Sequence, residues 1–357
     1  MTVKNLSYDQ KNKVDKVKKR LIEIFKRKNP PSEDQYIKVL DEINNVLKDE
    51  NENIRPYAKC DLPGGLLYLK SDMPTIIVPD IHARLDFFLN IMFFKYQNDL
   101  TVLDLLALDK LQIVCVGDGF HAEARAYDRW QRAFEEYNTE FEKHKNMDEE
   151  MRESLGVMEM VMTVKINFAD NFHFLKGNHE NISNERGEGN YPFRKFAYEG
   201  PMVLAYVEKF YSEEFLLKYY IFEKSLPLLA VGKNFIVSHS EPFTLYKKDE
   251  LIEYRDNPEL IKGLTWTDNN QADKNSVLQM INYYIESDQI DNSYYFGGHR
   301  PVPELYNPRA SGKYIQIHNP NKFIIVNIKS NKDINLEEDV IELNNRIKEI
   351  LKSNKTL

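Results

Sequence analysis

Residues 172–180 have the sequence FHFLKGNHE, in which a short apolar run is followed directly by polar side chains. An apolar run of this length that ends near a glycine predicts a buried β-strand. Asn178, His179 and Glu180 then lie in the loop where the strand ends. This stretch therefore predicts a strand that carries potential ligands or catalytic groups at its carboxyl end.

The chain repeats this arrangement at four other places. Apolar runs precede these polar residues: Asp80 and His82 after residues 75–78, Asp118 after 111–116, His239 after 235–237, and His299 after 294–296. Helical patterns occur between the runs, notably over 85–96 and 127–168, and a further strand is predicted over 323–326. Alternating strands and helices indicate an α/β domain. Because open α/β sheets bind ligands beyond the carboxyl ends of their strands, we expect these side chains to converge.

The converging side chains are carboxylates, an amide and imidazoles. This mixture of oxygen and nitrogen donors suits divalent ions such as Mn, Fe or Zn. In a site for two ions ~3.5–4 Å apart, one carboxylate usually bridges them and the pair grips the oxygens of a phosphoryl group. Any one of these histidines alone would more often be a hydrogen-bonded structural residue. Five strand ends that all release such groups favour metal binding.

The residues around these positions form five motifs in a fixed order. The motifs are Pro79-Asp80-Ile81-His82-Ala83, Gly117-Asp118-Gly119-Phe120-His121-Ala122-Glu123, Gly177-Asn178-His179-Glu180, the pair His239 and His299, and Leu264-Thr265-Trp266-Thr267-Asp268. In order and spacing, over residues 74–330, the sequence resembles the calcineurin-like metallophosphoesterase superfamily, and within it the phosphoprotein (Ser/Thr) phosphatases. The resemblance implies an α/β fold with a β-sandwich of two mixed sheets flanked by helices.

The resemblance also implies roles for individual residues and two divalent metal ions as cofactors, with Mn favoured over Fe or Zn. The implied metal ligands are Asp80 and His82 for the first ion, Asp118 for both ions, and Asn178, His239 and His299 for the second ion. His179 would be the general acid that protonates the leaving oxygen of a phosphorylated substrate. A hydroxide that bridges the two ions would attack the phosphoryl group.

The second motif departs from the family pattern. His121 stands where the family has an Asp that orients the catalytic histidine, and Ala122 stands where it has an Arg. The usual Arg before the last histidine also has no counterpart in Asn292-Ser293. Candidates for the missing phosphate contact are Arg125 and Arg300, with Arg84 and Arg186 as further alternatives. Because the phosphate-binding residues differ, the family's phosphoprotein specificity is not carried over.

Three parts are expected along the chain. They are a helical extension over residues 1–60, a metallophosphoesterase domain over 61–330 and a C-terminal helix over 331–357. In the first part, helical spacing on both sides of Pro30-Pro31 predicts a hairpin, whose second helix begins with a capping box formed by Ser32 and Gln35. In the last part, four apolar residues have the spacing of one helical face: Val340, Leu343, Ile347 and Leu351.

Charge is distributed unevenly along the chain. The net charge is −8, but residues 1–30 hold ten basic and three acidic residues, so they carry +7 and the remainder carries −15. An acidic body argues against a broad nucleic-acid surface. A basic helix such as the one expected at the N-terminus most often presents its charges to solvent. The alternative is that it binds an acidic partner or a membrane surface. No apolar run approaches the ~20 residues of a membrane span, and the sequence shows no secretory pattern. The two cysteines are isolated and do not suggest a disulfide framework. A cytoplasmic protein is therefore expected.

Three functions compete. The first is a metal-dependent phosphomonoesterase that acts on a phosphoprotein or a small phosphorylated molecule. The second is a hydrolase of nucleotides such as dinucleoside polyphosphates, because relatives with that activity also lack the Asp that His121 replaces. The third is a metal-binding scaffold in which the altered phosphate contacts have weakened catalysis. Of the other histidines, His318 is expected in a loop near the site, whereas His173 is expected to be structural and His144 exposed.

Overall fold

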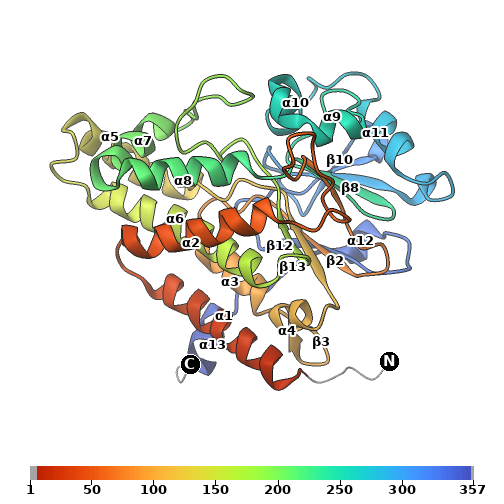
Figure 1. The fold of residues 1–357 in the computed structure, drawn as a ribbon, viewed down its shortest axis with the longest axis horizontal. Helices are drawn as coiled ribbons and strands as arrows, with labels where there is room; N and C mark the ends of the chain where they lie inside the picture. Colours follow the sequence, from red (N-terminus) through yellow and green to blue (C-terminus); the bar gives the residue numbers. More distant parts are fainter. Residues whose placement is uncertain (1–5, 355–357) are drawn as a thin grey trace.

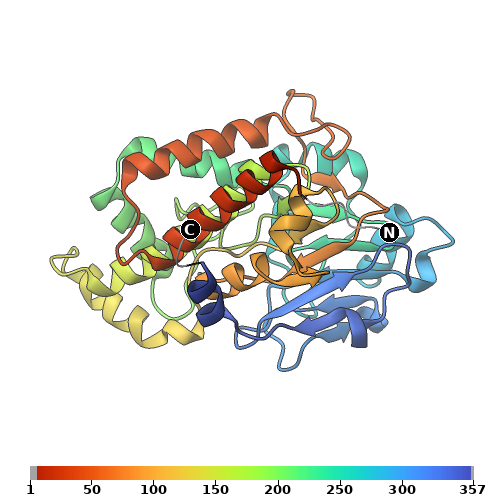
Figure 2. The same ribbon diagram turned by 90° about the horizontal axis from the view of Figure 1, so that it is seen from below.

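The computed structural model describes residues 6–354 and contains two large β-sheets that pack face to face (Figure 1, Figure 2). The first sheet has the strand order β13 (Val340–Glu342), β12 (Ile324–Ile328), β2 (Thr75–Val78), β5 (Gln112–Cys115) and β6 (Phe172–Phe174). The second has the order β1 (Leu66–Tyr68), β7 (Leu229–Val231), β8 (Phe235–Ser238), β9 (Tyr294–Gly297), β11 (Tyr314–Gln316) and β10 (Asn307–Arg309). Both sheets contain parallel and antiparallel pairs. The predicted β-sandwich of two mixed sheets is confirmed.

The side chains of the first sheet alternate between two apolar cores. Ile77 and Val114 face the second sheet and pack with its Val237 and Phe296. Ile76, the residue before Ile77, belongs instead to the core beneath the helices. Successive side chains of a strand point to opposite faces, so a strand such as β2 is apolar throughout only where both faces are covered.

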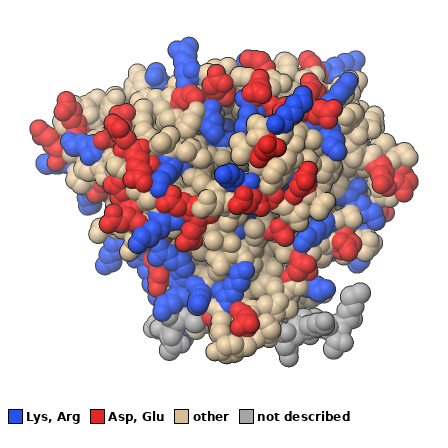
Figure 3. Space-filling model, viewed as in Figure 1, with Lys and Arg blue, Asp and Glu red and all other residues tan. Residues whose placement is uncertain are grey.

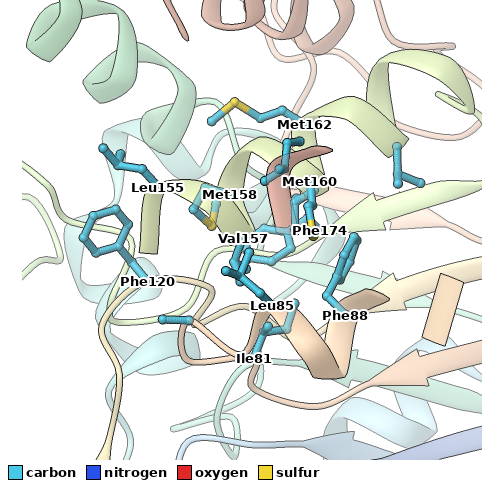
Figure 4. Close-up of a cluster of buried hydrophobic side chains, with 14 of the residues drawn as sticks. Ile81, Leu85, Phe88, Phe120, Leu155, Val157, Met158, Met160, Met162 and Phe174 are labelled. Atoms are coloured by element: carbon cyan, nitrogen blue, oxygen red, sulfur yellow. The ribbon is translucent and has the colours of Figure 1, made fainter. Parts of the chain in front are cut away.

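Helices cover the outer face of the first sheet. The most deeply buried is α6 (Lys145–Asn167), whose Met158 and Met160 lie in one cluster with Phe88 of α3 (Leu85–Met92) and Phe174 of β6 (Figure 4). The other helices on this side are α4 (Val102–Ala107), α5 (Tyr127–Asn138), α7 (Glu199–Phe210) and α8 (Glu213–Lys224). Within the described range, none of the helices is long and apolar enough to cross a membrane.

Shorter helices cover the outer face of the second sheet. They are α9 (Lys248–Ile252), α10 (Pro258–Thr265) and α11 (Ser276–Tyr284). Single 3-10 turns occur at η1 (Ala124–Ala126), η2 (Tyr254–Asp256), η3 (Ile290–Asn292) and η4 (Ala310–Gly312). On the outer face of the second sheet, Leu251, Leu260 and Met280 pack against Ile236 and Tyr295. Both sheets are therefore buried on both faces, and the ends of their strands are left for the functional site.

The predicted N-terminal hairpin is present and packs on the body of the protein. It consists of α1 (Tyr8–Lys26) and α2 (Glu33–Lys48), which contact α6 (Figure 2). Arg20 and Arg27 both bind the buried carboxylate of Glu159 in α6. Lys and Arg side chains also gather on the surface around α1 (Figure 3). Part of the basic charge thus stabilises the fold, and the acidic partner stays a prediction.

The capping box was predicted at the wrong helix. Ser32 precedes α2 but its side chain makes no capping hydrogen bond. The capping box forms at α1, where Ser7 and Gln10 exchange hydrogen bonds between side chains and backbone. Both helices have a serine three residues before a glutamine, so the residue pattern alone does not determine at which helix the capping box forms.

Two predicted helices are shorter than expected. The C-terminal segment forms α12 (Leu336–Asp339), then strand β13, and only then α13 (Ile347–Ser353), so Val340 and Leu343 do not share a helix with Ile347. Residues 340–342 pair with the edge of β12, which supplies backbone hydrogen-bonding partners that a local pattern does not reveal. The helix predicted over 85–96 ends at Met92, since β3 (Lys95–Gln97) and β4 (Leu100–Thr101) form a hairpin. Asn98 and Asp99 turn it with φ of 49° and 62°.

Candidate metal centre

The predicted ligand residues come from the carboxyl ends of strands in both sheets. Asp80 and His82 follow β2, Asp118 follows β5, and Asn178 and His179 follow β6. From the second sheet, His239 directly follows β8 and His299 lies two residues beyond β9. Because β2, β5 and β6 are parallel to one another, as are β8 and β9, their carboxyl ends meet at one edge of the sandwich. The structure brings all seven residues together there.

One group of donor atoms surrounds His82. Its Nε2 lies 3.9 Å from Asp80 Oδ2 and 3.7 Å from Asp118 Oδ2, and all three side chains are buried. Two donors that bind one ion at about 2.1 Å each lie at most about 4.2 Å apart, so His82 is close enough to share an ion with either carboxylate. His82 Nδ1 lies 3.0 Å from the carbonyl oxygen of His121. A hydrogen bond to that carbonyl places the proton on Nδ1 and leaves the Nε2 lone pair for a metal.

A second group of donor atoms surrounds Asn178. Its Oδ1 lies 2.8 Å from His239 Nε2 and 2.9 Å from His299 Nδ1. His239 Nε2 is also 3.3 Å from Asp118 Oδ2. His239 Nδ1 contacts the carbonyl oxygen of Val116 at 3.1 Å, which again directs Nε2 toward the centre. Asp118 is the residue common to both groups, as expected of a ligand that bridges two ions.

The loops that hold these residues approach one another very closely. A Cβ atom on Gly298 would lie 1.7 Å from Asp80 Oδ1, and one on Gly177 would lie 2.2 Å from Asp118 Oδ1. His82, Asp118 and His299 themselves have positive φ angles of 46°, 51° and 64°. Such conformations are costly for residues with side chains and concentrate at functional sites. The backbone is therefore shaped to present the donor atoms.

Glu180 joins two of these loops. Its carboxylate accepts hydrogen bonds from the backbone N–H groups of Asp118 at 2.9 Å, Gly119 at 2.8 Å and Gly177 at 2.7 Å. Asp118 Oδ1 in turn accepts from the N–H of His179 at 2.9 Å. Asp118 is thus fixed by the residues that adjoin it, and Glu180, for which the sequence predicted no role, holds its backbone in position.

Burial controls the ionisation of the centre. It raises the pKa of Asp80 to about 6, and burial together with Glu180 holds the pKa of Asp118 well above its usual range. Burial also lowers the pKa of His82 and of His299 to about 3. Neutral imidazoles offer lone pairs, while buried carboxylates are stable only when a cation neutralises them. Asp80 Oδ1 is a buried oxygen without a hydrogen-bonding partner in the described chain. The donor set therefore fits divalent metal ions.

His121 and His179 form a contact between two imidazole rings. Their Nδ1 atoms lie 3.1 Å apart, and His179 Nε2 points toward Asp118, with 3.8 Å between it and Oδ2. Phe193 packs against the His179 ring with centroids 3.8 Å apart. When His121 donates its Nδ1–H, His179 accepts at Nδ1 and carries its own proton on Nε2. This arrangement directs the Nε2–H of His179 toward the centre.

Three of the four candidate arginines are engaged with other groups, and the fourth, Arg186, is exposed. Arg300 forms a bidentate pair with Asp268, at 2.7 and 2.6 Å, and is partly exposed beside His299. Arg125 binds Glu153 and the carbonyl oxygen of Ala83. Arg84 is buried and donates to backbone carbonyls, so it serves the loop rather than a ligand.

Sequence reasoning missed two residues at the edge of the centre, Glu123 and Lys195. Lys195 Nζ binds Glu123 Oε1 at 2.8 Å, and Glu123 Oε2 lies 2.8 Å from His318 Nε2 and 3.8 Å from His82 Nε2. Glu123 ends the second motif at the position where the family pattern has a glycine, and this departure could have drawn attention to it. Lys195 belongs to no motif. His173 is buried in β6 and His144 pairs with Asp148 on the surface, in agreement with their predicted structural and exposed roles.

Comparisons with known proteins identify the family. Residues 73–321 match the family model described as calcineurin-like phosphoesterase. Among solved structures, a protein serine/threonine phosphatase from Saccharomyces cerevisiae with similarity to human phosphatase PP5 superposes with a TM-score of 0.54 at 12% identity, covering 88% of this chain and 89% of that chain. A cold-active protein-tyrosine phosphatase of a psychrophile, Shewanella sp., superposes with a TM-score of 0.44 at 13% identity, covering 74% and 77%. No curated protein matches the sequence.

The yeast structure shows that the fold is shared, and the family model adds more because its span includes every residue of both donor groups. Together they support a hydrolase that acts on phosphoric esters and depends on divalent metal ions. The matched residues make up well over half of the sequence, and the chain belongs to the calcineurin-like phosphoesterase family.

Proposed function

We propose that this protein is a phosphomonoesterase with two divalent metal ions, which acts on a phosphoprotein or a small phosphorylated molecule. The observation that carries the proposal is the position of Asp118 Oδ2, which lies 3.3 Å from His239 Nε2 and 3.7 Å from His82 Nε2. A carboxylate oxygen between imidazoles of two donor groups is suited to bridging a pair of ions. Mn is the proposed metal because the family resemblance favours it, and the mixture of carboxylate and amide oxygens with imidazole nitrogens suits it.

Different residues have different roles in the proposed reaction. Bound divalent ions would supply Lewis-acid stabilisation of the phosphoryl oxygens and lower the pKa of a coordinated water. When protonated, His179 gives its Nε2 proton to the leaving oxygen and is left as a neutral imidazole, while its Nδ1–H donates to Nδ1 of His121. Lys195 offers a positive charge at the edge of the centre, where the negatively charged phosphoryl group of a substrate enters.

A nucleotide is a second candidate substrate, and an aromatic hollow beside the centre favours it. The hollow has a volume of 620 Å³ and is lined in part by Phe243, Tyr246 and Trp266. The Trp266 ring lies 6.4 Å from the His299 ring between centroids, and Tyr191 packs edge-on against it. A base that stacks on such rings would keep its phosphates within reach of the centre. Turnover of dinucleoside polyphosphates at a higher kcat/KM than phosphopeptides would favour this candidate.

Metal removal tests the proposal. Protein stripped with a chelator should lose hydrolysis of an aryl phosphate and regain it with Mn²⁺. The Asp118→Asn variant keeps the shape of the side chain but removes the bridging charge, and kcat/KM should fall at least about 100-fold, the size of effect that follows loss of a key electrostatic group. His173→Ala, another change at a buried side chain, should leave activity intact and so controls for general damage. Binding of Mn²⁺ with no turnover on any phosphate ester would support the scaffold alternative instead.

A further inference from the structure

The end of strand β11 delivers one more imidazole to the centre. β11 pairs with β9 in parallel, with Gln316 opposite Gly297, and the N–H of Ile317 continues the ladder to the carbonyl oxygen of Gly297. His318 is two residues beyond Gln316, just as His299 is two residues beyond Gly297. Parallel strands in register place equivalent positions side by side. The register therefore puts His318 next to the ligand-bearing loop that follows β9.

His318 is fully buried and has one ring nitrogen without a partner. Its Nε2 lies 2.8 Å from Glu123 Oε2, a hydrogen bond that puts the ring proton on Nε2. Its Nδ1 has no hydrogen-bonding partner in the described chain and lies 3.7 Å from Asp80 Oδ2. The His82 ring is its neighbour, with 5.1 Å between centroids. A buried lone pair directed at a carboxylate oxygen is unfavourable unless a cation lies between them.

We propose that His318 is a ligand of the first metal ion through Nδ1, and that Glu123 is the positioning residue that orients it. Asp80, His82 and His318 each offer one atom, and these atoms lie within 4.8 Å of one another. Metal-binding histidines almost always donate their other N–H to a carboxylate, a carbonyl or a water, which fixes the ring and strengthens the ligand. Glu123 supplies this carboxylate, and Lys195 binds its second oxygen at 2.8 Å.

This inference rests on the proposed function and makes it more specific. With His318, the first ion would have three ligands of its own in addition to Asp118, and the second ion would have three as well. An equal number of protein ligands gives both ions firm binding. Loss of His318 should therefore weaken one ion and spare the other, which a purely structural hydrogen bond from His318 to Glu123 would not do.

Titration of the chelator-stripped full chain with MnCl₂ tests the inference by calorimetry. Wild-type protein should bind two ions. His318→Ala should bind one ion with unchanged affinity and the other at least about 10- to 100-fold more weakly, as expected for loss of a ligand or its support. His318→Asn, whose amide oxygen falls near the position of Nδ1, should recover part of the loss. Glu123→Gln should weaken the same ion by about tenfold.

A spectroscopic measurement separates a lost ligand from a damaged fold. The EPR spectrum of the wild type with Mn²⁺ should show two coupled ions, and that of His318→Ala should show an isolated ion. His173→Ala is the matched control, since His173 is also a buried histidine and both of its ring nitrogens lack a partner in the described chain; it should keep the coupled spectrum. Two ions bound equally well by folded His318→Ala and the wild type would overturn this inference alone. A wild-type protein that binds no ion would overturn the proposed function with it.

Discussion

The Nδ1 atoms of His121 and His179 lie 3.1 Å apart, at the position where the family resemblance places a carboxylate beside the catalytic histidine. A carboxylate would stabilise a protonated His179 by its charge, whereas a neutral imidazole can only accept a hydrogen bond from it. Burial, with the neighbouring His82, lowers the pKa of His121 to about 3, so the ring is neutral at physiological pH. Burial also holds the pKa of His179 well below its usual range, so less of this ring is protonated at neutral pH than in a histidine–aspartate pair.

Replacing His121 with Asp should increase the fraction of His179 that is protonated. A carboxylate that accepts the Nδ1–H of His179 raises the pKa of His179, and kcat on alkyl phosphates should increase about tenfold, a part of the 10²–10⁴ that general acid catalysis can contribute. Nitrophenyl phosphate has a leaving group that needs no proton, and its kcat should change little. His121→Asn has a side chain of the same size without the charge and serves as the control. An equal change on both substrates would contradict the role given to the pair.

His179→Ala should remove activity without removing metal. His179 Nε2 lies 3.8 Å from Asp118 Oδ2, close enough that the ring could be either an acid or a ligand. If His179 is an acid, its replacement should lower kcat on alkyl phosphates about 100-fold and should lower kcat on nitrophenyl phosphate less. Elemental analysis should still find the wild-type metal content. Loss of an ion in this variant would make His179 a ligand instead.

Lys195→Ala should weaken phosphate binding. The ammonium group binds Glu123 at 2.8 Å, and loss of a charge-assisted hydrogen bond to phosphate costs about 1.5–3 kcal/mol, which corresponds to a rise of about 10- to 100-fold in the inhibition constant of inorganic phosphate. Lys218→Ala removes another lysine held by ion pairs, to Asp41 and Glu214, and should have no effect. Parallel measurements on Arg125→Ala and Arg300→Ala show whether either predicted arginine contributes. Unchanged inhibition in Lys195→Ala would exclude it from the phosphate site.

A buried ion cluster should make stability depend on pH. Burial alone raises the pKa of Glu50, but attraction to Lys165 and Arg55 outweighs it and lowers the pKa to about 2. Since this value lies below the ordinary 4.5, the cluster stabilises the protein fully above pH 4.5 and loses that contribution as the pH falls toward 2. Glu50→Gln should lower the free energy of unfolding at pH 7 by about 3 kcal/mol.

Urea denaturation of wild type and Glu50→Gln over this pH range provides the measurement. The difference in unfolding free energy between them should be constant above pH 4.5 and shrink below it. Glu52→Gln, a change at an exposed carboxyl nearby in the sequence, is the control and should cost little. A difference that does not vary with pH would mean that Glu50 stabilises the protein through its shape rather than its charge.

The sequence by itself determined the strands of the sandwich core and the residues at their carboxyl ends. Asp80, Asp118, Asn178 and His239 were recognisable because a buried strand and the polar loop after it are encoded within about ten neighbouring residues. Gly177 belongs to the same local pattern, and its role is now explained by the contact with Asp118 that a side chain would prevent. Local patterns of this kind can be recognised without knowledge of the fold.

Only the tertiary structure decided which side chains support those ligands. Glu123 and His318 are 195 residues apart and meet because β11 pairs with β9 in one particular register. The strand that replaces the predicted helix at Val340 forms because β12 has a free edge there. Lys195 reaches Glu123 from a loop without regular structure. Contacts between distant segments depend on how strands pair and where loops run, and no short stretch of sequence contains that information.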